Sequence, residues 1–459
     1  MREDDVVELW LDGRPILIAK EYDISIAFLQ VPNAFSIVIG SGATAVDLLR
    51  RFPPGTPFVL KINGIVQFMG FLDGPERQQG EATQLQLIGR DALAQLVDDE
   101  IEHDRSFVNA TFDEITNAAF TSAGYEGISL TYDAAAHRKA VTGTPIIEEK
   151  VEERTFTSKP VSGKDTDEKQ IVLVSTGEAA GTPFAYDVLT VRQGTTVVET
   201  TQKKLVQKIT GFKAEKPILW KAGTSHYQAL AREYQRAGLF LRAGVDPEGV
   251  DPNVFLLSQP NPVQTPLFGL IRALDKDPPA NLVNVVPGRI ANLTTNRHAK
   301  YIVRGRTGGG KDGRQQIEGV FLDEEMVALG YTKRRVVVDE HAKTKKQAEF
   351  YARKACADAR RANRTFTYTV LGRHSLPMLA APARRALPTP DICVSLVDDE
   401  HGMRGIFWVE RVRFRASATG GTFTDFVLMV PDDVVFGDAE LLSAADKKGR
   451  AVLGKAKPK

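Results

Sequence analysis

Residues 57–73 read PFVLKINGIVQFMGFLD, and this stretch decides the fold. Asn63-Gly64 separates two apolar runs, and a tight primed turn needs positive φ at both of its central residues. This combination is the strongest short signal for a β-hairpin. A third run, 83–91, alternates apolar and polar residues in the manner of a half-buried strand. We therefore predict a small antiparallel barrel organised around this hairpin.

Composition limits the possible functions of the chain. With 459 residues, two to four domains are expected. The 59 Lys and Arg residues balance 58 Asp and Glu residues, so tight nucleic-acid binding through phosphate neutralisation is not expected. Cys356 and Cys393 provide no disulfide framework, which favours a reduced compartment. The charged N-terminus does not resemble a secretory signal, and no apolar run has the length of a membrane span, so we expect no membrane insertion.

The first hundred residues contain six or seven short runs of strand character separated by turn signals. Asp12-Gly13 is a second hairpin turn, and Pro32-Asn33 interrupts two further alternating runs. Regular short strands of this kind favour a closed sheet, because closure removes exposed edges. We predict a first β-barrel domain over residues 1–103.

The middle of the chain mixes helix and strand signals. Residues 111–114 form a capping box, and a second helix is expected from Thr224 or Ser225 to Gly238. Residues 134–181 are rich in Lys, Glu, Thr, Gly and Pro, which indicates an extended excursion or β-arm, and residues 186–218 return to strand-like alternation. We interpret 134–218 as an insertion. We predict an α/β domain over 104–288 that carries this insertion.

The last folded block is again dominated by strands. A helix over 344–362 begins with a capping box of Thr344 and Gln347 and carries a stripe of alanines, which lets a helix lie close to a sheet. Two hairpins follow, 392–397 with 406–409 and 412–415 with 423–430. We predict a second β-barrel domain over 289–435 and a basic, mobile tail over 436–459. The expected fold class is β-rich α+β, with two small antiparallel β-barrel domains and an α/β middle domain.

One glycine-rich loop nearly matches a phosphate-binding motif. Gly305 to Lys311 follows an expected strand, as in the G-x-x-x-x-G-K-[ST] pattern. Asp312 replaces the hydroxyl that ligates magnesium, and it would repel a triphosphate. We interpret 305–314 as a surface loop.

Other candidate chemistry is also weak. Asp339-Glu340-His341 and Asp398-Asp399-Glu400-His401 resemble metal-ligand runs, but adjacent residues rarely chelate one ion together. Cys356 and Cys393 fall in the alanine stripe and in a strand, so we interpret them as small buried apolar residues. We predict no catalytic, cofactor-binding or metal-binding residues.

The order of several short motifs resembles that of phage baseplate hub proteins of the Mu type, which are related to the N-terminal part of type VI secretion spike proteins. The motifs are Phe68-x-Gly70-x-x-Asp73, Gly89-Arg90-Asp91, Leu96-Val97-Asp98, the helix and strand from Leu230 to Phe240, Pro260-Asn261, Val370-x-Gly372, Trp408-Val409-x-Arg411-Val412-x-Phe414, and Leu428-x-Val430-Pro431. The resemblance covers both ends of the chain and parts of its middle, and segment 134–218 departs from it.

This resemblance implies that both barrels are tube-like and that the protein is a structural baseplate hub of a contractile tail, not an enzyme. A homotrimer with two barrels per subunit would present six barrels and so adapt a sixfold tail tube to a threefold spike. The implied partners are the tail tube protein, the central spike protein, other baseplate proteins and the tape measure protein. DNA would pass through the lumen without specific binding, in a virion assembled in the host cytoplasm.

Two other classes of function stay open from the sequence. The chain could be a β-rich carbohydrate-binding or adhesion module. It could also be a hydrolase that acts on nucleotides through the Gly305 loop, or one that degrades the cell wall. Fold analogy alone does not decide among these classes.

Overall fold

The fold is described from a computed structural model. It describes residues 5–17, 21–39, 51–78, 84–107, 112–125, 129–132, 143–157, 199–214, 218–236, 238–245, 251, 253–273, 278–306, 316–339, 342, 344–417 and 419–435. The chain divides into two compact units: Pro145–Gly211 forms one, and Met1–Thr144 with Phe212–Lys459 forms the other.

The first sheet is built around the predicted hairpin. Asn63 and Gly64 both have positive φ, at 52° and 77°, and they join β5 to β6. All seven strands pair antiparallel, in the order β2-β1-β5-β6-β7-β4-β3. Their bounds are β1 Val7–Leu11, β2 Arg14–Leu17, β3 Glu21–Ala27, β4 Ala34–Ile39, β5 Pro57–Ile62, β6 Ile65–Gln78 and β7 Gln84–Asp91. The hairpin and the third strand predicted from the sequence are both confirmed.

The second half of the main unit contains a closed ring of six strands. The ring runs β24-β23-β15-β16-β20-β25 and returns from β25 to β24. The bounds are β15 Phe268–Ile271, β16 Leu282–Asn292, β20 Arg364–Leu371, β23 Cys393–Asp398, β24 Met403–Ser417 and β25 Gly421–Met429. The two hairpins predicted near the C-terminal end are present, and both use the single long strand β24.

The ring differs from the expected antiparallel barrel in one strand. β15 pairs parallel with both β16 and β23, and its sequence FGLI is apolar throughout because both of its faces are covered. A four-residue apolar run has no alternation that would identify it as a strand. Two strands of the ring therefore begin before residue 289, where the sequence had placed the start of the second domain.

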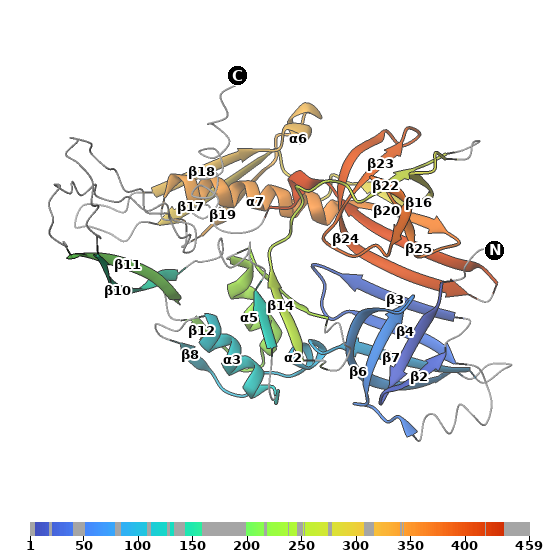
Figure 1. Cartoon of the computed structure of the whole chain (residues 1–459). Helices are drawn as coiled ribbons and strands as arrows, with labels where there is room; N and C mark the ends of the chain where they lie inside the picture. The colour runs from blue at the N-terminus through green and yellow to red at the C-terminus, as the bar shows by residue number, and fades with distance from the viewer. Residues whose placement is uncertain are drawn as a thin grey trace, which may run out of the picture. The chain divides into compact units, whose positions relative to one another are not determined.

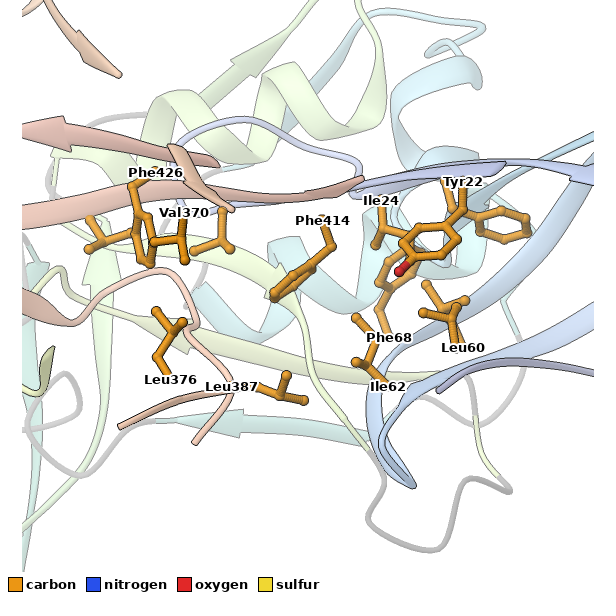
Figure 2. Packing of buried hydrophobic residues seen from close by; sticks show 14 of the residues in the cluster. Tyr22, Ile24, Leu60, Ile62, Phe68, Val370, Leu376, Leu387, Phe414 and Phe426 are labelled. Carbon is orange, nitrogen blue, oxygen red and sulfur yellow. The ribbon is translucent and has the colours of Figure 1, made fainter. Parts of the chain in front are cut away.

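The two sheets share one hydrophobic core. The buried cluster contains residues of both, including Ile24 and Phe68 from the first sheet and Phe426 from the ring. Figure 2 shows Phe414 of β24 between the two groups, and Phe414 pairs in register with Ile24 of β3. β3 and β24 thus join the blue and red strands of Figure 1 into one continuous sheet.

A third group of elements forms an α/β layer with its own core. The group contains α2 Ala94–Asp98, β8 Arg105–Phe107, α3 Phe112–Ser122, β9 Ser129–Tyr132, β12 Ile218–Trp220, α5 His226–Arg236, β13 Phe240–Ala243 and β14 Val254–Ser258. Aromatic rings fill this core, with Phe120 and Phe255 4.6 Å apart between ring centroids. The helix predicted to end at Gly238 is α5, and Gly238 has φ of 74°. Thr111 of the predicted capping box lies outside the described residues.

A small sheet with a long helix lies between β16 and β20 in the sequence. The strands are β17 Lys300–Arg306, β18 Gln316–Leu322 and β19 Arg334–Val338, and the helices are α6 Glu324–Ala328 and α7 Lys345–Asn363. α7 begins with the predicted capping box of Thr344 and Gln347, and its alanine stripe packs on the sheet. A Cβ on Gly319 of β18 would lie 2.1 Å from the backbone carbonyl carbon of Ala348, so only glycine allows this approach.

A buried ion network ties this small sheet to the ring. Arg297 and Asp323 are both fully buried and 2.9 Å apart, and Arg360 of α7 reaches the same carboxylate at 2.7 Å. Arg364 at the start of β20 pairs with Asp433 at 2.6 Å, at the C-terminal side of the ring, in the short 3-10 helix Pro431–Asp433. Every charge in the network therefore has an opposite partner, as burial requires.

The described part of the smaller unit is a two-stranded sheet. It consists of β10 Gly143–Thr157 and β11 Glu199–Ala214. This agrees with the β-arm expected within 134–218, of which residues 158–198 lie outside the described part. The remaining short strands, β21 Leu376–Met378 and β22 Ala381–Ala386, pair with each other. Among the described helices, none combines the length and apolarity needed to cross a membrane.

Candidate functional site

The most distinctive surface of the main unit follows the line where the two sheets join. β3 and β24 pair antiparallel over six residue pairs, from Ala27–Arg411 to Tyr22–Ala416. Alternate residues point to opposite faces of a strand. Phe414 and Ile24 therefore enter the core, whereas Arg411, Arg413 and Arg415 lie on the opposite face. We call this opposite face of β20, β25, β24, β3 and β4 the seam face.

Polar side chains form a connected row across the seam face. Thr369 of β20 donates to Asp425 of β25 at 2.7 Å, and Arg415 of β24 holds the same carboxylate at 2.6 Å. Arg413 pairs with Asp23 of β3 at 2.6 Å. Because cross-strand neighbours on one face lie about 5 Å apart, the row crosses from one sheet to the other without a break.

The row contains positive and negative groups in equal number. Arg411, Arg413 and Arg415 are matched on this face by Glu21, Asp23 and Asp425. Four of these residues, Glu21, Asp23, Arg413 and Arg415, line a shallow hollow of about 270 Å³. The hydrogen bond to Asp23 raises the pKa of Arg413 and so favours its charged form. The face is hydrophilic but carries no excess charge, and such a surface attracts neither an anion nor a cation strongly over long distances.

A buried histidine links the two sheets near one end of the β3–β24 pairing. His374, in the loop after β20, lies between the Tyr22 hydroxyl at 2.7 Å and the Thr424 hydroxyl at 2.8 Å. Asn63, in the first hairpin turn, bonds to Ser375 at 2.8 Å and to Asp5 at 2.7 Å. The two sheets are thus held together by polar contacts as well as by their shared core.

The His374 ring is fully buried, and this changes its titration. Burial lowers its pKa to about 4, while the charge of Asp5 acts in the opposite direction. His374 is therefore neutral at pH 7, and a neutral ring can donate to one hydroxyl group and accept from the other. Burial also raises the pKa of Tyr22, which stays protonated. The two side chains that link the sheets here, His374 and Tyr22, are thus both uncharged.

The structure brings together three of the motifs that carry the family resemblance. Arg90 forms ion pairs with Asp73 at 2.7 Å and with Asp98 at 2.6 Å. The intervening glycines are required by packing, since a Cβ on Gly70 would lie 2.0 Å from the Arg90 carbonyl oxygen. These residues fix the passage from the first sheet into α2, so their role is structural.

The sequence candidates for chemistry have structural explanations where they are described. Gly305 is the second-last residue of β17, and a Cβ there would lie 1.8 Å from the carbonyl oxygen of Ala342. Lys311 and Asp312 of the same loop lie outside the described residues. Cys356 and Cys393 are buried, and burial raises the pKa of both thiols, that of Cys356 to about 12. Both cysteines are therefore small buried apolar residues, as predicted.

The two runs of possible metal ligands form no cluster in the described part of the chain. Asp398 is buried and accepts hydrogen bonds from the Tyr368 hydroxyl and from the backbone N–H of His401, while Asp399 pairs with Arg404. In the other run, Glu340 and His341 lie outside the described residues. The turn 398–401 is therefore held by protein groups.

The seam face was not identified from the sequence. Its signal is the alternation of Arg411, Arg413 and Arg415 with apolar residues on one strand, which places three cations on one face. The carboxylates that pair with them lie on β3 and β25, and the pairing of β3 with β24 is a long-range contact that no local pattern contains.

No protein-family model matches the sequence, and no curated protein matches it significantly. Solved structures are similar in fold. The tail protein from Neisseria meningitidis MC58 matches with a TM-score of 0.59 and 18% identity, over 94% of this chain and 99% of that one. The 43 kDa tail protein of prophage MuSo2 from Shewanella oneidensis matches with a TM-score of 0.57 and 16% identity, over the same shares. The chain thus has the fold of phage tail proteins, and the predicted resemblance to Mu-type hub proteins is confirmed at the level of fold.

Proposed function

We propose that this protein is the structural hub of the baseplate of a contractile phage tail or of a related injection particle. It acts as a homotrimer between the sixfold tail tube and the threefold central spike. The observation that carries this proposal is the pairing of β3 with β24, which joins two sheets of one chain edge to edge. Three copies then place six such sheets around one axis, so a threefold assembly presents a sixfold surface.

The seam face lines the channel of this hub. Its balanced ion pairs suit a surface past which the tape measure protein and DNA must move without being retained. A basic lining would bind DNA phosphates through counterion release, and an apolar lining would hold the tape measure protein. The proposed role needs no catalysis, and the seam face offers ion pairs and hydroxyl groups as its polar chemistry.

The test is the mass and the symmetry of the purified full-length protein. We expect a native mass of three times 50.4 kDa and threefold projections with six similar density features around a central channel. Added tail tube protein should bind one end of the ring. A protein that stays monomeric both in solution and in assembled particles would rule the proposal out.

A further inference from the structure

The small sheet β18-β17-β19 has one covered and one open face. α7 covers the face that carries Tyr301, Val303 and Val337. By the pairing register, the open face carries Glu318, Val320 and Leu322 of β18, Lys300, Ile302 and Arg304 of β17, and Arg334, Val336 and Val338 of β19. We call this set of residues the open face.

The apolar side chains on the two outer strands of the open face are accessible to solvent, while Ile302 on the central strand is only 7% exposed. Val320 and Val336 flank Ile302 across the three strands and are 38% and 48% exposed, and Leu322 and Val338 are 50% and 63% exposed. Sixteen large apolar side chains are exposed in the described part of the chain, and seven of them fall within residues 320–338. Such a concentration marks a protein interaction surface.

The charges of the open face limit the geometry of any contact with a second copy. Arg304 is paired with Glu318 at 3.3 Å, while Lys300 and Arg334, which pair in register, add positive charge. A twofold contact would place these like charges opposite one another, which is unfavourable. A second copy must therefore offer a different, acidic surface, and a contact between unlike surfaces builds a ring when its rotation closes.

The chain presents such a surface at residues 98–104. This segment contains five acidic residues and no lysine or arginine. Glu100, Glu102 and Asp104 are exposed, and the neighbouring strand β12 exposes Leu219 by 59%, with Leu219 paired to Ser106. We call Glu100, Glu102, Asp104 and Leu219 the acidic ridge.

We propose that the open face binds the acidic ridge of a neighbouring copy of this chain and thereby closes the homotrimer. This inference rests on the proposed hub function, and it adds the location and the polarity of the subunit contact. Apolar side chains on both surfaces would be removed from water, and arginines would meet carboxylates at the rim.

Charge reversal in the purified full-length protein tests the proposal. We expect Lys300→Glu with Arg334→Glu, and separately Glu100→Lys with Glu102→Lys, to raise the protein concentration needed for trimer formation by about tenfold or more. The four changes together should restore assembly, because the charges are then exchanged. Arg384→Glu with Arg385→Glu on β22 reverses two exposed positive charges elsewhere, so it is the matched control and should assemble like the wild type.

Mixing the two defective variants gives a second measurement. The open-face variant keeps an intact ridge and the ridge variant keeps an intact open face, and their altered surfaces also carry opposite charges, so an equimolar mixture should assemble at a lower protein concentration than either variant alone. Circular dichroism and Tm confirm that each variant folds.

The outcomes separate this inference from the proposed function. Variants that assemble like the wild type, or a fourfold variant without rescue, would overturn the inference and leave the hub proposal standing. Variants that stay trimeric but lose binding to tail tube or spike protein would assign the open face to that partner and also overturn it. A wild-type protein that never exceeds a monomer would overturn both.

Discussion

Arg413 on β24 donates hydrogen bonds to the carboxylate of Asp23 on β3, with 2.6 Å between Nε and Oδ1, although 390 residues separate the two in the sequence. The pair bridges the two strands that join the sheets, and Arg415 with Asp425 repeats the arrangement one strand further on. An exposed ion pair of this kind contributes only about 0–1 kcal/mol to stability. The main effect of these ion pairs is therefore on the charge of the seam face, because the carboxylates cancel the positive charge of the arginines.

Removal of the two carboxylates should turn the seam face into a DNA-binding surface. In the Asp23→Asn/Asp425→Asn variant, Arg413 and Arg415 keep their charge but lose their partners. We expect this variant to retain duplex DNA at low salt and to release it steeply as salt rises, whereas the wild type binds weakly throughout. A filter-binding titration over a salt series measures this difference.

The matched control for this measurement is Asp358→Asn/Asp399→Asn, which adds the same charge at ion pairs away from the seam face. Equal DNA retention by both variants would mean that total charge, rather than the seam face, decides binding.

His374 should make the fold sensitive to mild acid. Its pKa is about 4 in the folded protein and about 6.5 in an unfolded chain, so the unfolded chain binds more protons between these values. The neutral ring makes its full contribution to the free energy of unfolding above pH 7, and this contribution is lost as the pH falls toward 4. We expect the free energy of unfolding to fall by on the order of 3 kcal/mol more in the wild type than in His374→Gln.

Urea unfolding at a series of pH values from 7 to 4 measures this difference. Carboxylates that titrate in the same range affect both proteins alike, so their effect cancels in the comparison. His103→Gln removes a histidine whose side chain is 81% exposed and should follow the wild-type curve. Parallel curves for the wild type and His374→Gln would contradict the assigned role of the buried ring.

Removal of one charged partner from the ion network around Arg297 should lower the stability of the protein strongly. Although burial acts to raise the pKa of Asp323, hydrogen bonds from Arg360 and Arg297 lower it, so the carboxylate stays charged. Asp323→Leu leaves the guanidinium of Arg297 buried with Glu325 as its remaining carboxylate partner, and we expect a loss of about 3 kcal/mol. Arg297→Met combined with Asp323→Leu removes both charges and should cost less than the sum of the single changes. Denaturant unfolding of the four proteins gives this coupling energy.

Local signals explain how much of this fold was predictable from the sequence. The Asn63-Gly64 turn and the Thr344–Gln347 capping box each depend on residues close together in the chain, and both are present in the structure. The parallel strand β15 and the pairing of Asp23 with Arg413 depend on contacts between distant segments, and neither leaves a pattern within a short window. The seam face and the open face belong to this second kind, because tertiary pairing decides which face of a strand is left uncovered.

The contact between α7 and its sheet should depend on the absence of a side chain at Gly319. A Cβ at this position would lie 2.1 Å from the Ala348 carbonyl carbon and the Glu349 nitrogen, and helix backbone cannot yield as a flexible side chain can. We expect Gly319→Ala to lower the free energy of unfolding by about 1–3 kcal/mol through overpacking. Gly288→Ala is the control, since its Cβ would meet Thr367 at 3.3 Å and requires only a small adjustment.

Thermal unfolding should give a clear decrease in Tm for Gly319→Ala and little change for Gly288→Ala. Similar Tm values for both variants would show that α7 can move away from β18 with little loss of stability. The close approach at Gly319 would then not explain how the alanine stripe of α7 is held on the sheet.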